Sequence, residues 1–146
     1  MSTTGLEVFD KTLQETNLWL KALGSEIGGE DRHRAYLILR STLHALRDRL
    51  GPQAAAQFGA QLPILLRGVF YEGWRPSDTP IKDRHAEAFL AHVRAGLPAG
   101  MKLNVGEAVR AVLAVIWQRV DPGEVSKMAK FMPAELREFW PRVAIE

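Results

Sequence analysis

Apolar side chains recur along the chain at alternating steps of three and four residues, which is the spacing of one face of an α-helix. The first stripe ends at a glycine pair, and the second follows Asp31, whose carboxylate can cap the free N–H groups that begin a helix. No segment alternates apolar and polar residues as a β-strand does. The two stripes are Leu6, Phe9, Leu13, Thr16, Leu20 and Leu23, and then Tyr36, Leu39, Leu43, Leu46 and Leu50.

Prolines mark the starts of shorter helices after the second stripe. Proline is tolerated in the first turn of a helix because the backbone N–H that it lacks would have no partner there. Pro52 and Pro63 therefore predict two short helices, and Pro122 and Pro133 predict two more near the C-terminus. Asp121 strengthens the third of these starts because its side chain can cap the helix that Pro122 begins.

The second half of this pattern repeats the first after 70 residues. Residues 39–71 align without a gap with residues 109–141, and seven of the 33 positions are identical. A chain of this composition gives about two or three identities by chance. We expect an all-α fold of about eight helices, formed by an internal tandem duplication of a four-helix unit (long, long, short, short) packed as one bundle. The chain should be a single domain, with copies at about 6–71 and 81–141 and a junction at 72–80.

Three of the identical positions are arginines. An arginine that occurs in both copies favours a shared structural role, such as capping the carbonyl groups of a short helix or pairing with acids between helices. A phosphate-binding surface is the alternative. The pairs are Arg40 with Arg110, Arg49 with Arg119, and Arg67 with Arg137.

The composition is that of a globular protein, with 47% hydrophobic and 25% charged residues. Basic and acidic residues alternate to a net charge of +2, and no polybasic arm is visible. The absence of cysteine excludes disulfides, thiol nucleophiles and thiolate metal sites, and it fits a cytoplasmic protein. The uncharged stretch 51–66 contains two prolines and predicts no membrane span, and the N-terminus predicts no secretory signal.

The junction carries the most unusual residues of the chain. A glycine and two prolines within residues 70–80 interrupt any helix, while Tyr71 and Trp74 bring large rings with polar groups. The rings could fill the seam between the two copies, with Glu72 and Arg75 paired locally. Alternatively, the segment is an exposed recognition loop for a protein partner, because tyrosine, tryptophan and arginine are favoured at interface hot spots. The candidate binding residues are Tyr71, Glu72, Trp74 and Arg75.

This junction and the helix before it resemble the bacterial family catalogued as domain of unknown function 2267. The resemblance lies in the element Leu62-Pro63-x-x-x-Arg67-Gly68-x-Phe70-Tyr71-Glu72-Gly73-Trp74-x-Pro76, which follows Leu43-His44-Ala45-Leu46-Arg47-Asp48-Arg49-Leu50. It also takes in Phe9 to Leu20 and Pro133 to Pro141, and so covers nearly the whole chain. The resemblance implies an all-helical prokaryotic domain and brings no catalytic residues.

No residues match a catalytic or metal-binding motif. None of the five serines lies in a Gly-x-Ser-x-Gly element, and Ser41 with His44 lacks an orienting carboxylate. His85 and His92 can share a helix face, but seven residues separate their α-carbons by about 10 Å, too far for one metal ion. We therefore expect no enzyme activity, no cofactor and no metal.

The leading functional hypothesis is a non-catalytic module that binds a protein partner, most simply a second copy of itself. One alternative is a nucleic-acid-associated protein, which would use Arg32, Arg34, Arg40, Arg47 and Lys127 or Lys130. The other is a small-ligand-binding bundle with a pocket near Tyr36, Trp74 and Trp117.

Overall fold

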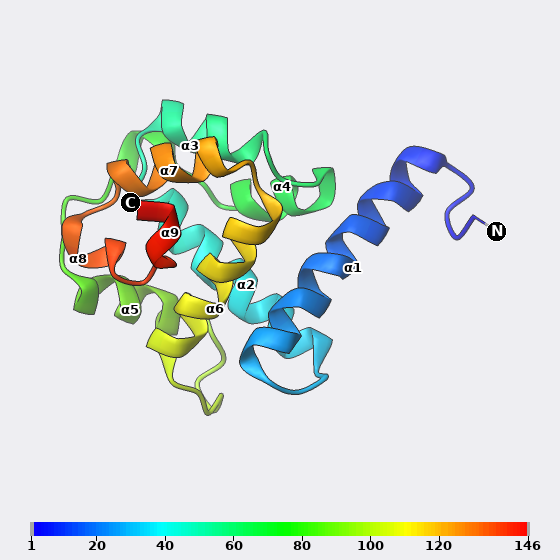
Figure 1. The fold of residues 1–146 in the computed structure, drawn as a ribbon, viewed down its shortest axis with the longest axis horizontal. Helices are drawn as coiled ribbons and strands as arrows, with labels where there is room; N and C mark the ends of the chain where they lie inside the picture. Colours follow the sequence, from blue (N-terminus) through cyan, green and yellow to red (C-terminus); the bar gives the residue numbers. More distant parts are fainter. Residues whose placement is uncertain (1, 146) are drawn as a thin grey trace.

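The computed structural model describes residues 2–145, except for the side chains of Val143 and Ile145. Within this range the chain is helical and contains no β-strand, which confirms the all-α prediction (Figure 1). A 3-10 helix, Pro76–Asp78, precedes α5, and one further turn, α9 (Arg142–Ile145), follows the eight expected helices. Those eight are α1 (Glu7–Ile27), α2 (Arg32–Arg47), α3 (Pro52–Gly59), α4 (Ile64–Tyr71), α5 (Ala86–Ala95), α6 (Val105–Arg119), α7 (Pro122–Phe131) and α8 (Ala134–Arg137).

The capping residues that the sequence predicts begin their helices as expected. Asp31 accepts a hydrogen bond from the backbone N–H three residues on, at 3.1 Å, and α2 starts at the next residue. Asp121 does the same for α7 at 3.2 Å, and Pro122 is the first residue of that helix. Asn104 caps α6 in the same way at 3.0 Å, although the sequence pattern had not singled it out.

The starts of the short helices recur with the spacing of the sequence repeat. The first residues of α3 and α7, Pro52 and Pro122, are 70 positions apart, and so are those of α4 and α8. The first helix of each half differs, because α1 has 21 residues and α5 only 10. The prediction of a long helix at the start of the second copy is therefore wrong. Pro76 and Pro80 precede α5, and proline disfavours helix both at its own position and at the one before.

One hydrophobic core joins the two halves. Helix α1 packs against α2 and α6, α2 also contacts α4 and α5, and α3 contacts α7. The central helices α2 and α6 supply many of the side chains that are fully buried, as their apolar stripes predict. Burying each leucine or isoleucine stabilises the fold by about 1.5–3 kcal/mol before entropy is counted. The fully buried residues of these helices include Ile38, Leu39, Leu43, Leu46, Leu113 and Ile116.

Helix α1 extends beyond this core. Its C-terminal half is covered by α2 and α6, and its first buried residue is Thr16. None of residues 6–15 is buried, and in Figure 1 this end of α1 projects away from the other helices. At 1.5 Å per residue, the projecting helical segment is roughly 14 Å long. We call residues 6–15 the N-terminal arm.

One pair of repeated arginines has the predicted capping role. The Nη2 group of Arg67 donates to the carbonyl of Ala60 at 3.2 Å, and that of Arg137 donates to the carbonyl of Lys130 at 3.0 Å. These two acceptors are themselves 70 residues apart. Each arginine therefore ties α4 or α8 to the end of the short helix before it. The other pairs differ between the halves: Arg49 is buried and Arg119 exposed, while Arg40 binds the Glu72 carboxylate and Arg110 the backbone carbonyl of Glu138.

Candidate functional site

The two junction rings are packed against the body of the protein. Tyr71 and Trp74 are partly buried and stack on each other, with ring centroids 5.3 Å apart. The Tyr71 hydroxyl donates to the carbonyl of Ala56 at 3.4 Å. It also lies so close to Gly59 that a side chain there would clash with it. Helix α3 therefore positions Tyr71, and Tyr71 in turn positions Trp74.

Glu72, the acidic residue of the junction, is held by two arginines of α2. Arg40 forms an ion pair with the Glu72 carboxylate at 2.6 Å, and its hydrogen bond lowers the pKa of Glu72. The Nη1 group of the buried Arg47 donates to the carbonyls of Phe70 and Glu72 at 2.9 and 2.7 Å. Glu72 is thus held by α2, and the predicted local pair with Arg75 does not form.

Arg75 is the most exposed member of the predicted site. Its side chain is 83% exposed, and its nearest acidic partner is Asp78 at 3.9 Å. Glu72 is also exposed on the outer surface, whereas the two rings lie partly inside. The structure therefore brings the four predicted residues together as neighbours, with their aromatic groups turned to the core and their charged groups to the surface.

A second polar cluster links the end of α2 to α5. Arg49 is buried above the ring of Phe89, and its Nη1 group lies 2.8 Å from Nδ1 of His92. Asp48 lies 3.7 Å from the other imidazole nitrogen of His92. Since arginine can only donate, Nδ1 must accept, which requires neutral His92. Burial lowers the pKa of His92 and the positive charge of Arg49 lowers it further, so the neutral form is favoured.

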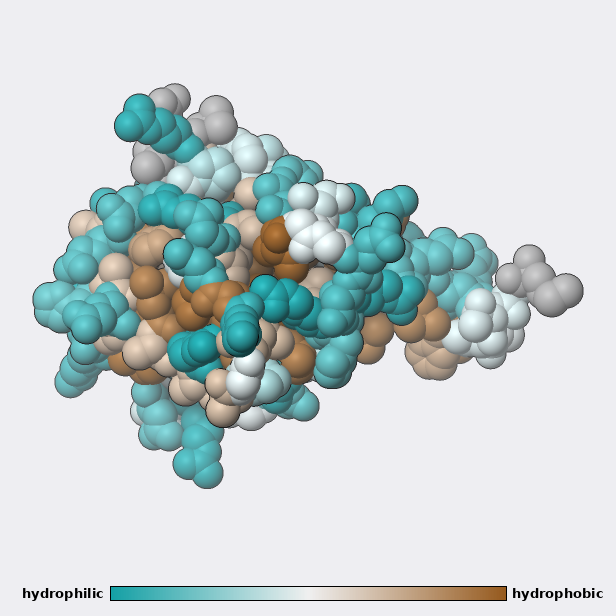
Figure 2. Space-filling model, turned by 90° about the horizontal axis from the view of Figure 1, so that it is seen from below, coloured by the Kyte–Doolittle hydropathy of each residue, from teal (hydrophilic) through white to brown (hydrophobic). Residues whose placement is uncertain are grey.

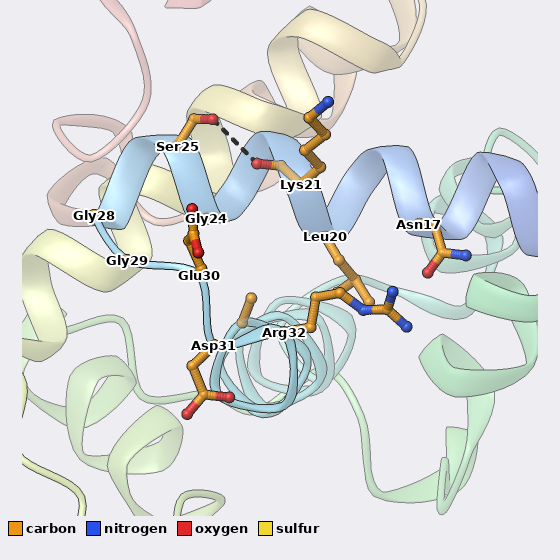
Figure 3. A pocket seen from close by; sticks show the side chains of 11 residues that line it. Asn17, Leu20, Lys21, Gly24, Ser25, Gly28, Gly29, Glu30, Asp31 and Arg32 are labelled. Atoms are coloured by element: carbon orange, nitrogen blue, oxygen red, sulfur yellow. Dashed lines mark hydrogen bonds between the residues drawn. The ribbon is translucent and has the colours of Figure 1, made fainter.

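Two kinds of binding site, for a metal ion and for a small ligand, can be tested against the described residues. Within the described residues, no group of three or more His, Asp or Glu side chains could hold a metal ion. A cleft of about 600 Å³ lies between the end of α1 and the start of α2 (Figure 3), and Tyr36, Trp74 and Trp117 do not line it. The charged side chains around it include Lys21, Glu30 and Arg32, which are exposed, and Asp31, which serves as the cap of α2. None of the helices within residues 2–145 has the length and apolar character needed to cross a membrane.

The basic residues named for nucleic-acid binding are largely engaged within the chain. Arg47 is buried, and Arg40 is paired with the Glu72 carboxylate. Arg34 donates to the carbonyl of Lys102 at 3.3 Å, and Lys127 lies 3.7 Å from the carboxylate of Glu124. Such internal pairing reduces the positive charge that these residues could offer to a phosphate backbone.

Most of the large apolar side chains that are exposed among the described residues lie on the N-terminal arm and the adjoining first turn of α4. Phe9 and Ile64 are each 55% exposed, and Leu6, Val8 and Leu65 between 41 and 49%. Figure 2 shows apolar side chains along one edge of the projecting segment. Thr12 joins the two elements, because its hydroxyl oxygen accepts a hydrogen bond from the backbone N–H of Leu65 at 2.9 Å.

The arm differs in charge from the rest of the chain. It carries three acids (Glu7, Asp10 and Glu15) against Lys11, a charge of −2. The remaining residues carry 18 bases against 14 acids, a charge of +4. Asp10 accepts hydrogen bonds from the hydroxyl of Ser2 and from the hydroxyl and backbone N–H of Thr4, which lower its pKa and keep it ionised.

This surface was not among the predicted sites, because the stripe from Leu6 to Leu23 predicts one helix face and does not show where burial along that face ends. A usable signal was present in the repeat. A shift of 70 pairs residues 7–15 with residues 77–85, which contain Pro80 and a charged run and cannot form a matching stripe. Residues 7–15 therefore have no apolar stripe as a counterpart in the second copy. The later part of the stripe has such a counterpart, and this difference could have indicated that only the later part is buried.

Comparison with known proteins adds a boundary at the same place. The model of a family described as "Uncharacterized conserved protein (DUF2267)" matches residues 16–139. None of the curated proteins compared matches the chain. The matched segment begins at Thr16, the first buried residue of α1, so the N-terminal arm lies outside it.

Proposed function

The chain belongs to the DUF2267 family, and we propose that it is a non-catalytic protein-interaction module that associates with a second copy through its N-terminal arm. One observation carries this proposal. Leu6 and Phe9 continue, along one face of α1, the stripe that includes the buried Leu20 and Leu23, yet about half of each outer side chain is exposed to solvent. Exposed apolar clusters on an otherwise polar surface mark contact sites in proteins.

The size of this apolar surface suits a symmetric contact. Full burial of a large apolar side chain stabilises a complex by about 1.5–3 kcal/mol, so covering the exposed half contributes about 1 kcal/mol. Five such side chains give about 5 kcal/mol per copy, and a two-fold contact uses the set of both copies, about 10 kcal/mol. Association costs about 4–15 kcal/mol in lost freedom. The stabilisation from both copies' side chains lies within this range of costs, whereas the stabilisation from one copy's side chains reaches only the lower end of the range.

The charge distribution also supports association between copies. An arm of charge −2 is attracted to the body of another copy, which carries +4. The attraction is screened at high salt, so we expect weaker association as ionic strength rises. The net charge of +2 is small enough that repulsion between whole copies does not oppose the contact.

Sedimentation equilibrium over a range of concentrations tests the proposal. The informative variant is Phe9→Ser, and Leu18→Ser is the matched control, since Leu18 is 48% exposed on the opposite face of the same helix. We expect reversible dimers for the unchanged chain and for Leu18→Ser, and monomers for Phe9→Ser. A chain that is monomeric throughout, or equal losses in both variants, would contradict the proposal.

We also propose that an internal duplication produced this fold and that the protein acts in the cytoplasm. Support for the duplication comes from the 70-residue spacing of the short-helix starts and from the matching bonds of Arg67 and Arg137. The cysteine-free composition supports the location. A non-catalytic role is supported by the use of Arg40, Arg47 and Arg49 in packing and in contacts within the chain.

A further inference from the structure

We propose that Phe9 of one copy inserts into a groove beside the arm of a second copy, and that the second copy's Phe9 enters the first copy's groove in return. This inference rests on the self-association proposed above and specifies its contact. It concerns a different surface from the predicted junction site, whose rings are packed against their own chain.

The groove lies between the arm and the first turn of α4 and has a volume of about 240 Å³. Its apolar walls are Val8, Leu62, Pro63 and Ile64, together with Thr12. Pockets for small-molecule ligands usually measure about 300–1,000 Å³. This groove is smaller than that range and open along one side, which suits a single large side chain from another protein.

Phe9 of the same chain is not one of the residues that line this groove. The groove is bounded on α1 by the side that carries Val8, and Phe9 lies about 100° further round the helix. A helical side chain covers the surface near its own position and cannot turn back across its helix. The ring is therefore exposed next to a groove that it does not occupy, and the ring of a second copy can enter that groove.

The closeness of the ring and the groove favours a reciprocal contact. Phe9 is the sequence neighbour of Val8, which lines the groove, so a two-fold axis passing near the arm places each ring beside the other copy's groove. Such isologous contacts repeat every interaction twice and close after two copies. The predicted assembly is therefore a dimer rather than a chain of molecules.

Charge at the groove matches the acidic arm. Lys11 and Arg67 line the groove against one acid, Glu15, so its local charge is positive. The Arg67 guanidinium is fixed in place by hydrogen bonds to the carbonyls of Gly59, Ala60 and Leu62. An entering Phe9 brings the ionised Asp10 next to it, which meets this positive edge.

A mixing experiment with two full-length variants tests the reciprocal arrangement. Phe9→Ser removes the ring and leaves the groove, whereas Ile64→Glu keeps the ring and places a negative charge in the groove, where it repels Asp10 of the partner. Each variant alone has two damaged contacts per dimer. Their mixture can form one intact contact, from Phe9 of the Ile64→Glu copy into the groove of the Phe9→Ser copy.

We expect native mass spectrometry to show a mixed dimer, with an association constant about tenfold or more above that of either variant alone. Circular dichroism melting of each variant checks that it is folded. If the unchanged chain dimerises but the mixture associates no better than its components, this inference fails while the proposed function stands. If the unchanged chain does not dimerise, both fail.

Disulfide trapping gives a second readout, in a mixed pair that keeps one of the two proposed contacts intact. The chain has no cysteine, so a Phe9→Cys variant and an Ile64→Cys variant can be mixed and oxidised without background. We expect a covalent dimer that contains one copy of each variant. The control mixes Leu18→Cys with Ile64→Cys and should give far less of the mixed product. Equal yields, or none from the Phe9→Cys mixture while the unchanged chain dimerises, would overturn the inference.

Discussion

Helices α1 and α5 occupy the same place in the 70-residue repeat but begin in different ways. Helix α5 begins at Ala86, whose N–H donates to the carboxylate of Glu135 at 3.0 Å, and His85 contacts the same carboxylate. The position 70 residues earlier is Thr16, where α1 becomes buried, but α1 has already run for nine residues by then. In the second half the helix start is tied to the body, whereas in the first it extends into solvent.

This difference shows which part of α1 supplies the core and which part extends beyond it. A helix that starts at residue 16 is enough to supply Trp19, Leu20 and Leu23 to the core. The family match begins at the same residue. The arm is therefore an apolar extension beyond the core-forming helix, and its exposed residues can be changed without opening the core.

The largest expected effect on stability is the difference between shortening a buried side chain of the α1 stripe, after Thr16, and shortening an exposed one before it. Leu23→Ala leaves a cavity at a fully buried position and should lower the free energy of unfolding by about 2–5 kcal/mol. Phe9→Ala should change it by less than about 0.5 kcal/mol at concentrations where the chain is monomeric. Urea unfolding measures both. Comparable losses would show that Phe9 packs on its own chain.

The paired arginines allow a second comparison of the two halves. Arg67 donates to three backbone carbonyls, and Arg137 to the single carbonyl of Lys130. We expect Arg67→Ala to lower the free energy of unfolding by about 2–3 kcal/mol, and Arg137→Ala by about 1 kcal/mol or less. Thermal and urea unfolding would report the difference. A larger loss of stability for Arg137→Ala than for Arg67→Ala would contradict the expectation that Arg67 contributes more to the fold.

The arm's attachment to α4 gives a smaller effect. Thr12→Val removes the acceptor for the backbone N–H of Leu65, at a helix start where Pro63 offers no side-chain cap. The cost should be about 1 kcal/mol, as for the loss of a helix cap. Thr12→Ser keeps the hydroxyl and serves as the control. If valine and serine behave alike in urea unfolding, this hydrogen bond does not stabilise the protein.

The smallest expected effect is a change in how stability depends on pH. His92 has a lowered pKa in the folded chain, so the unfolded chain binds a proton more readily. The stability that His92 contributes is fully present above about pH 6.5, the ordinary pKa of histidine. This stability is lost as the pH falls from there through the lowered pKa of the folded chain. The glutamine of His92→Gln can still accept a hydrogen bond from Arg49. In this variant the free energy of unfolding should change less between about pH 7.5 and 5, which spans roughly one unit or more on either side of the ordinary histidine pKa.

A second histidine provides the control of opposite sign. Glu135 raises the pKa of His85, first through a hydrogen bond and then through its charge. The contribution of His85 is therefore present below its ordinary pKa and lost as the pH rises through the raised value. Because His85 is exposed, His85→Gln should change the profile little. A profile of His92→Gln that keeps the full loss at acidic pH would contradict the role assigned to this cluster.

Local features of the fold were predictable from the sequence, whereas contacts between distant residues were not. Asp31, Asp121 and the prolines act within one helical turn, so their patterns predicted helix starts correctly. The partner of Glu72, Arg40, lies 32 residues away, and no local pattern selects it over Arg75. The same limit applies to the arm, because a helical stripe looks the same whether another helix covers it or solvent does.

Hydrogen exchange along α1 at several protein concentrations tests the central claim most directly. We expect the backbone amides after Thr16 to be protected at every concentration, because the core covers them. The amides of residues 10–15 should exchange fast in dilute solution and slow as the dimer forms. Arm amides whose exchange rates do not change with concentration would contradict the claim that the N-terminal arm binds a second copy.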